Sequence, residues 1–160
     1  MKYSVLALPL ALMMAAGTAM AADPIEKQVT VTATIPTENF YVEPVGGNWM
    51  NEPQDMAWNS FQQTLQPIRK QLQVRSTSGP ISAYLTNPAT ITSGADTIGL
   101  DVSVAGKSLT LTSAEVISRE QGAPGATAGS EVAAQAAGAG GYTPGNYLGV
   151  VNMMFETTAE

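Results

Sequence analysis

The apolar and polar residues of this chain alternate in short runs with a period of two, which predicts β-strands. The earliest run spans residues 25–35, and from Val29 onward one face is apolar and threonines occupy the other. Its apolar face consists of Val29, Val31, Ala33 and Ile35. A lone strand is not stable in water, so this one must pair within its own sheet or with another molecule.

Three internal runs predict further strands at residues 68–76, 81–85 and 98–104. Residues 62–73 also show helical spacing of leucine and isoleucine, but Pro67 argues against a regular helix there. After residue 104, the turn 105–107 and the alternating Leu109 and Leu111 predict a hairpin with one buried face.

The last run, residues 147–155, is more apolar than a half-exposed strand should be. One face carries Tyr147, Val151, Met153 and Phe155, and the other carries Leu148, Val150 and Met154. Because both faces need cover, we expect this strand to be central in a sheet or to be covered by a partner.

Three other regions are less regular. Residues 121–141 are rich in glycine and alanine and predict a mobile loop, with a weak strand at 130–137 as the alternative. Aromatic residues and methionines at 49–58 predict core packing under a long loop, or a sugar-binding platform. Arg69, Lys70 and Arg75 form a basic cluster, expected at a solvated strand edge or at a receptor contact.

Many short strands without a long helix predict an all-β sandwich. The chain begins with the features of a secretory signal peptide: a basic residue, an apolar run at 5–16 and the small-x-small site Ala19-Met20-Ala21. We therefore expect cleavage after Ala21 and export as a single domain. The apolar run is too short to predict a membrane span.

Composition narrows the functional classes. The net charge is −6, and it becomes more negative once Lys2 leaves with the signal peptide, which argues against nucleic acid and anionic lipid as partners. The chain has no cysteine and no histidine, so we expect no disulfide, no common zinc site and no catalytic triad. We expect no cofactor and no catalytic residue.

Both ends of the mature chain resemble a known family. E-K-Q-V-T-V-T-A-T-I-P at residues 26–36 resembles the mature start of the CS1-type (colonisation factor antigen I-like) fimbrial major pilins of the alternate chaperone–usher pathway. T-P-G-N-Y-L-G-V-V-N-M-M-F at 143–155 is similar to the last strand of that family. Residues 72–76 and 98–110 fit its middle strands, whereas 49–63 and the Gly/Ala-rich segment match weakly.

This resemblance implies an immunoglobulin-like sandwich that lacks its final strand. Residues 22–36 would be the donor strand and 37–160 the incomplete pilin domain, completed by the donor of a neighbouring subunit. The implied donor side chains are Ile25, Val29, Val31, Ala33 and Ile35. The implied acceptor groove includes Tyr147, Val151, Met153 and Phe155.

The implied function is that of the major structural subunit of an adhesive fimbria. Implied partners are other copies of the chain, a periplasmic chaperone, an outer-membrane usher, a tip adhesin and host-surface glycans. The alternative is an exported monomeric binding module that binds carbohydrate through Trp49, Tyr41 or Trp58. A carboxylate-based enzyme is a third option, but no spacing singles out an acid–base pair.

Overall fold

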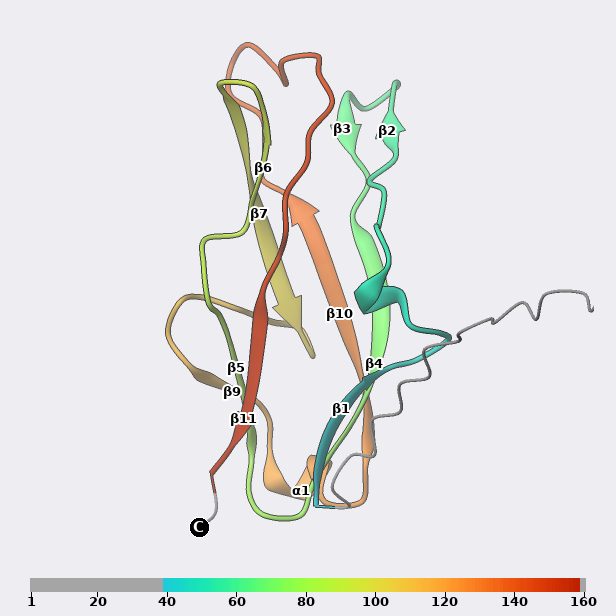
Figure 1. The fold of residues 1–160 in the computed structure, drawn as a ribbon, viewed down its shortest axis with the longest axis vertical. Helices are drawn as coiled ribbons and strands as arrows, with labels where there is room; N and C mark the ends of the chain where they lie inside the picture. The colour runs from blue at the N-terminus through green and yellow to red at the C-terminus, as the bar shows by residue number, and fades with distance from the viewer. Residues whose placement is uncertain (1–38, 159–160) are drawn as a thin grey trace, which may run out of the picture. The chain divides into compact units, whose positions relative to one another are not determined.

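The computed structural model describes residues 39–158. The predicted signal peptide and the first predicted strand, residues 25–35, therefore lie outside the described residues. The described part contains two sheets that face each other, a separate short hairpin and two short helical turns (Figure 1). The prediction of an all-β sandwich is confirmed.

The larger sheet has the strand order β1-β4-β10-β7-β6, and β8 pairs with the end of β7. Its strands are β1 (Phe40–Pro44), β4 (Ile68–Ser76), β6 (Thr90–Ser93), β7 (Asp96–Val104), β8 (Lys107–Ser108) and β10 (Ala126–Ala134). The smaller sheet has the order β11-β5-β9. Its strands are β5 (Ile81–Leu85), β9 (Ala114–Ile117) and β11 (Met153–Thr157). All pairings in both sheets are antiparallel.

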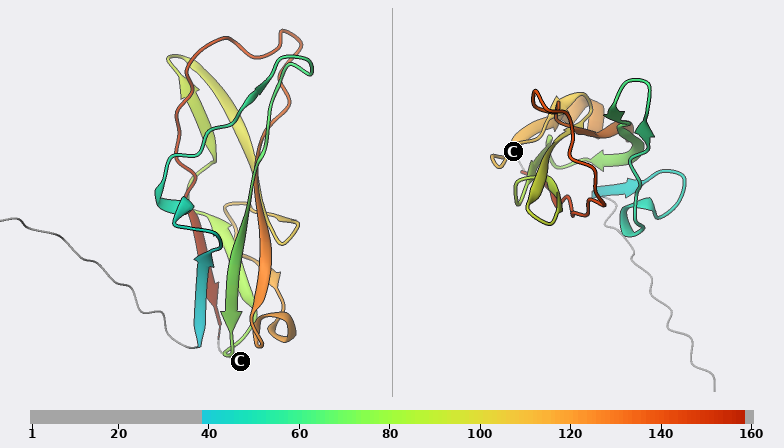
Figure 2. Two further views of the ribbon diagram at one scale, coloured as in Figure 1. Left: turned by 90° about the vertical axis from the view of Figure 1, so that its right-hand side faces the viewer. Right: turned by 90° about the horizontal axis from the view of Figure 1, so that it is seen from above.

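The remaining elements mark the two ends of the sandwich (Figures 1 and 2). The hairpin of β2 (Trp58–Asn59) and β3 (Thr64–Leu65) lies at one end, which we call the hairpin end. The helix α1 (Arg119–Gly122) lies at the other end, the base, beside the turn 77–80. The base also holds the start of β1, because Thr77 N–H donates to Asn39 O over 2.9 Å. A 3-10 turn, η1 (Trp49–Asn51), lies between the two ends.

Alternation along each strand builds the core. In β4 the side chains of Leu72, Val74 and Ser76 are buried, whereas Gln71 and Gln73 are exposed. The same period buries one face of β5 and β7, and the inner faces of the two sheets pack together. The principal core side chains are Leu72, Val74, Ile81, Ala83, Leu85, Leu100, Val102, Val104, Val116 and Ile117.

The expectation of a mobile loop at residues 121–141 is wrong for its middle part. Residues 126–134 form β10, which pairs with β4 on one side and with β7 on the other. A strand held on both edges does not depend on large side chains of its own, because neighbouring strands supply its hydrogen bonds and its cover. Ala128 and Ser130 fit here because they face the core and are buried.

Two smaller expectations also need correction. The expected edge position holds for Arg69 and Lys70 but not for Arg75. β1 pairs only with residues 72–76 of β4, so Arg75 lies beside β1, whereas Arg69 and Lys70 pair only with β10, and Arg69 Nε contacts Glu131 Oε2 at 2.5 Å. The hairpin after β7 is short, because β8 ends at Ser108. Leu109 is buried as predicted, but Leu111 is 57% exposed.

A buried serine fastens the C-terminal strand at the base. The Ser76 hydroxyl donates to Gly79 O over 2.7 Å and lies 2.8 Å from Thr157 Oγ1. Ser76 is fully buried, so its removal would leave Thr157 and Gly79 without this partner.

We expect Ser76→Ala to lower the free energy of unfolding by about 1–3 kcal/mol, because buried polar groups lose their hydrogen bonds. Urea denaturation measures this change. Ser103→Ala, at a less buried serine on β7, is the matched control and should stay within about 0.5 kcal/mol of the parent. Equal effects of the two substitutions would contradict the role of Ser76.

Candidate functional site: an open apolar cleft

The C-terminal segment is only partly a strand. We predicted a strand from Tyr147 onward, but β11 begins at Met153. Before Met153, only separate backbone hydrogen bonds hold the segment. Leu148 and Thr92 exchange two hydrogen bonds of 2.9 and 3.0 Å, and Thr86 N–H donates to Asn152 O. Regular pairing with β5 ends here because the chain after β5 continues as β6, which pairs with β7 in the larger sheet.

The predicted central position of this strand is also wrong, since β11 is the last strand of its sheet. One of its edges pairs with β5, and its other edge has no partner strand within residues 39–158. On the opposite sheet, β1 is likewise the last strand. Unpaired backbone edges of this kind accept an added strand.

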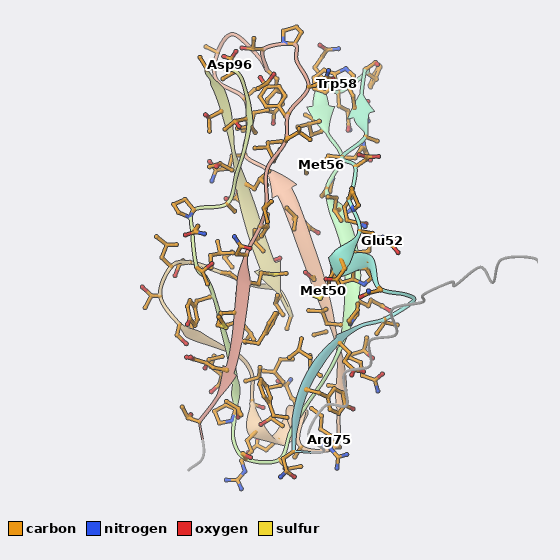
Figure 3. The ribbon with its side chains drawn as sticks, viewed as in Figure 1. Met50, Glu52, Met56, Trp58, Arg75 and Asp96 are labelled. Carbon is orange, nitrogen blue, oxygen red and sulfur yellow. The ribbon has the colours of Figure 1, made fainter. Side chains whose placement is uncertain are left out.

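An apolar cleft of about 1480 Å³ opens beside the C-terminal segment. Its floor is the inner face of the larger sheet, with Ile68 of β4, Leu100 of β7 and Val132 of β10. One wall is the C-terminal segment, and the other runs from η1 to the start of β2 and includes Met56 and Trp58 (Figure 3). Leu100 is buried at the bottom of this cleft, whereas Ile68 and Val132 are only half-buried.

An aromatic pair lines the cleft at the hairpin end. The rings of Trp58 and Tyr142 meet edge to face with their centroids 6.0 Å apart. Two hydrogen bonds fix this loop: Tyr142 Oη donates to Gln135 O over 2.6 Å, and Tyr147 Oη donates to Thr143 O over 2.8 Å. This end of the cleft is thus built from segments far apart in the sequence.

Three of the four predicted acceptor residues line the cleft: Tyr147, Val151 and Met153. Phe155 does not, and it packs against the core further along β11. On the other face, Leu148, Val150 and Met154 are 80%, 74% and 45% exposed, although Leu148 and Val150 also line the cleft. The predicted donor residues Ile25, Val29, Val31, Ala33 and Ile35 lie outside the described residues.

Sequence reasoning missed the cleft floor and its second wall. The alternation in β4 and β7 did predict which residues face inward, but it gave no sign that Ile68 would be only half-buried. Val132 lies in the Gly/Ala-rich segment, for which the sequence predicted a loop with no inward face. Trp49 and Met56 pack partly against the core, as the core-packing interpretation predicted.

The aromatic residues considered for sugar binding do not form one platform. Trp49 and Trp58 line the cleft. Tyr41 alternates with Phe40 and Val42, which pack on the core, so it faces the outer side of the larger sheet. Among residues 39–158 there is no group of three or more acidic, histidine or cysteine side chains able to hold a metal ion. None of the described helices is long and apolar enough to cross a membrane.

Comparisons with known proteins identify relatives of this chain. The family described as CS1 type fimbrial major subunit matches residues 25–156. A solved structure, the CooA pilin subunit from enterotoxigenic Escherichia coli, superimposes with a TM-score of 0.63 at 15% sequence identity. That match covers 75% of this chain and 88% of the CooA chain, and it concerns the fold. No curated protein sequence matches the chain.

Proposed function

This chain belongs to the CS1 type fimbrial major subunit family, and on that premise we propose that its cleft accepts residues 22–36 of a neighbouring subunit. It is a major structural subunit that polymerises into a surface fimbria. Residues 37–160 would then be the incomplete pilin domain, and residues 22–36 its donor strand, exposed after cleavage at Ala21. The family is structural rather than enzymatic.

The observation that carries this proposal is the apolar cleft beside an unpaired strand edge. A strand added at the edge of β11 would gain main-chain hydrogen bonds, and its alternate side chains would enter the cleft. Residues 29–35 have the required alternation, with apolar residues on one face and threonines on the other. Ile25, Val29, Val31, Ala33 and Ile35 would fill the cleft, and Tyr147, Val151 and Met153 would contact them.

The energetics favour an extended interface rather than a few contacts. Burying four large aliphatic side chains contributes about 6–12 kcal/mol at roughly 1.5–3 kcal/mol each. Ordering the donor costs about 1–2 kcal/mol per residue. The hydrogen-bonded ladder and the rest of the interface must therefore supply the net affinity.

Donor and cleft belong to different subunits, so the contact is head-to-tail and does not close on itself, as a filament requires. Before assembly a cleft this apolar needs cover, and we propose that a periplasmic chaperone provides it after export. An outer-membrane usher would then exchange chaperone for donor, and a tip adhesin would terminate the fibre. Attachment to host-surface glycans would follow from the assembled fibre.

Removal of residues 22–36 from the mature chain should abolish fibre formation, because the cleft then has no donor. A synthetic peptide of residues 22–36, added in trans, should bind the truncated protein one to one and raise its unfolding temperature. Electron microscopy and differential scanning calorimetry measure the two effects.

A peptide with the same composition in scrambled order is the control, and it should not raise the unfolding temperature. A monomeric binding module behaves differently: it stays monomeric at high concentration and folds equally well without these residues. That outcome would overturn the proposed function.

A further inference from the structure

The tip of the β2–β3 hairpin carries a phenylalanine, Phe61, that does not pack within its own subunit. Phe61 is 97% exposed, so its ring contributes almost nothing to the packing of its own subunit. A single exposed apolar residue is common and indicates nothing alone. Two further observations indicate that Phe61 contacts a partner: the hydrogen bonds that order its turn, and the position of the hairpin beside the cleft.

The turn that carries Phe61 is held in one conformation. Asn59 Oδ1 accepts hydrogen bonds from the backbone N–H groups of Phe61 and Gln62, both at 3.0 Å. The Gln62 side chain accepts from Asn59 Nδ2 at 3.0 Å, and Gln63 Nε2 donates to Ser60 O over 2.7 Å. Gln63 adopts a left-handed φ of 55°. A tip ordered in this way presents its aromatic side chain at little entropic cost on binding.

The same hairpin forms part of the cleft. Trp58 and Leu65 are paired across its two strands, and both line the cleft together with Gln63. The surface around Phe61 is therefore continuous with the acceptor site. A partner that reaches this end of the cleft would meet the hairpin tip.

The length of the chain outside the structure limits where the neighbouring subunit lies. Only residues 36–38 separate Ile35, the last donor side chain, from the described domain of the donating subunit. Four residue steps span at most about 14 Å, so the base of the donating subunit stays close to one end of the cleft it fills.

The direction of the donor decides which end this is. β11 runs toward the base, where Thr157 Oγ1 lies 2.8 Å from Ser76 Oγ. A donor parallel to β11 would bring Ile35 to the base of the acceptor. Every subunit would then donate and receive at its base, the bodies would crowd together, and no linear fibre would grow. An antiparallel donor brings Ile35 to the hairpin end and continues the antiparallel pattern of the domain.

We propose, resting on the proposed function, that Phe61 at the hairpin tip docks against the base of the next subunit, at α1 and the turn 77–80. The fibre would then have two contacts per junction, the donor strand and this aromatic contact. The partner is a second copy of the chain, and the contact would restrict bending between neighbouring subunits.

Photo-crosslinking in assembled fibres tests this docking. With p-benzoylphenylalanine in place of Phe61, irradiation should give a ladder of covalent multimers, with crosslinks mapped by mass spectrometry to residues 76–80 or 118–124 of the neighbour. The same probe in place of Leu111, which is exposed between β8 and β9, is the control and should give no crosslinks to those residues.

Phe61→Ala provides an independent measurement. It should leave the unfolding temperature of the donor-complemented monomer unchanged, yet raise the rate of subunit dissociation from fibres roughly tenfold, as for loss of an interface anchor. Leu111→Ala should not change that rate. If wild-type fibres form but Phe61 gives neither crosslinks nor faster dissociation, the docking contact is wrong and the proposed function stands. If no fibres form at all, the proposed function itself fails.

Discussion

Val31→Asp is expected to abolish fibre formation while leaving the subunit–chaperone complex intact. Val31 is the middle residue of the apolar face of residues 25–35, so it would occupy the centre of the cleft of the next subunit. The substitution removes about 1.5–3 kcal/mol of apolar burial and adds the cost of an unpaired buried carboxylate, several kcal/mol more. Since about 1.4 kcal/mol is a factor of ten, donor affinity should fall by more than roughly a thousandfold.

Electron microscopy of surface filaments and co-purification with the chaperone measure the two outcomes. Thr30→Asp is the matched control, because it adds the same charge to the opposite face of the same strand. It should permit fibres, since Thr30 would face away from the cleft. Fibres from the Val31→Asp variant, or equal loss in both variants, would show that the proposed donor register is wrong.

The second large effect is expected at Gly149, on the wall of the cleft. A Cβ atom there would clash with the backbone oxygen of Thr90 and come within 3.0 Å of Ile91 Cα. Gly149→Ala should therefore push the C-terminal segment away from β6 and break the hydrogen bonds between Leu148 and Thr92. We expect the free energy of unfolding to fall by about 1–3 kcal/mol, typical of overpacking, and the peptide of residues 22–36 to bind more weakly.

Gly129→Ala is the control for this substitution. Gly129 lies in β10, and nothing lies within 4 Å of a Cβ atom added there. The change should stay within about 0.5 kcal/mol of the parent or stabilise slightly, because alanine reduces the entropy of the unfolded chain. If Gly149→Ala has no more effect than Gly129→Ala on denaturation and peptide titration, the close approach of the wall to β6 is not essential.

The strands that sequence predicts well are those with strict alternation. β4 and β5 have the predicted bounds, 68–76 and 81–85, and β7 extends the predicted 98–104 by two residues. In each of them an apolar face is buried against the facing sheet, so the local pattern and the tertiary environment agree. The pattern states which side of a strand is inward, because side chains alternate across a pleated backbone.

The errors lie where pairing, rather than side-chain pattern, decides the structure. β10 is a central strand although residues 126–134 include small residues, because β4 and β7 hold its backbone on both sides. The segment before Met153 has an ideal strand pattern but little regular pairing, because β6 turns to the other sheet. Neither the central position of β10 nor the irregular pairing before Met153 can be predicted from the residues of that segment alone.

The sequence by itself determined the all-β class, the inward faces of the strands and the presence of an apolar run, residues 25–35, in need of a partner. It did so because alternation and propensity act over a few residues. Only the tertiary structure decided that β11 is an edge strand, that half-buried Ile68 and Val132 form part of the cleft floor, and that Phe61 is exposed at the tip of the β2–β3 hairpin. These features depend on which strands are neighbours, and strand neighbours are chosen by contacts between residues far apart in the chain.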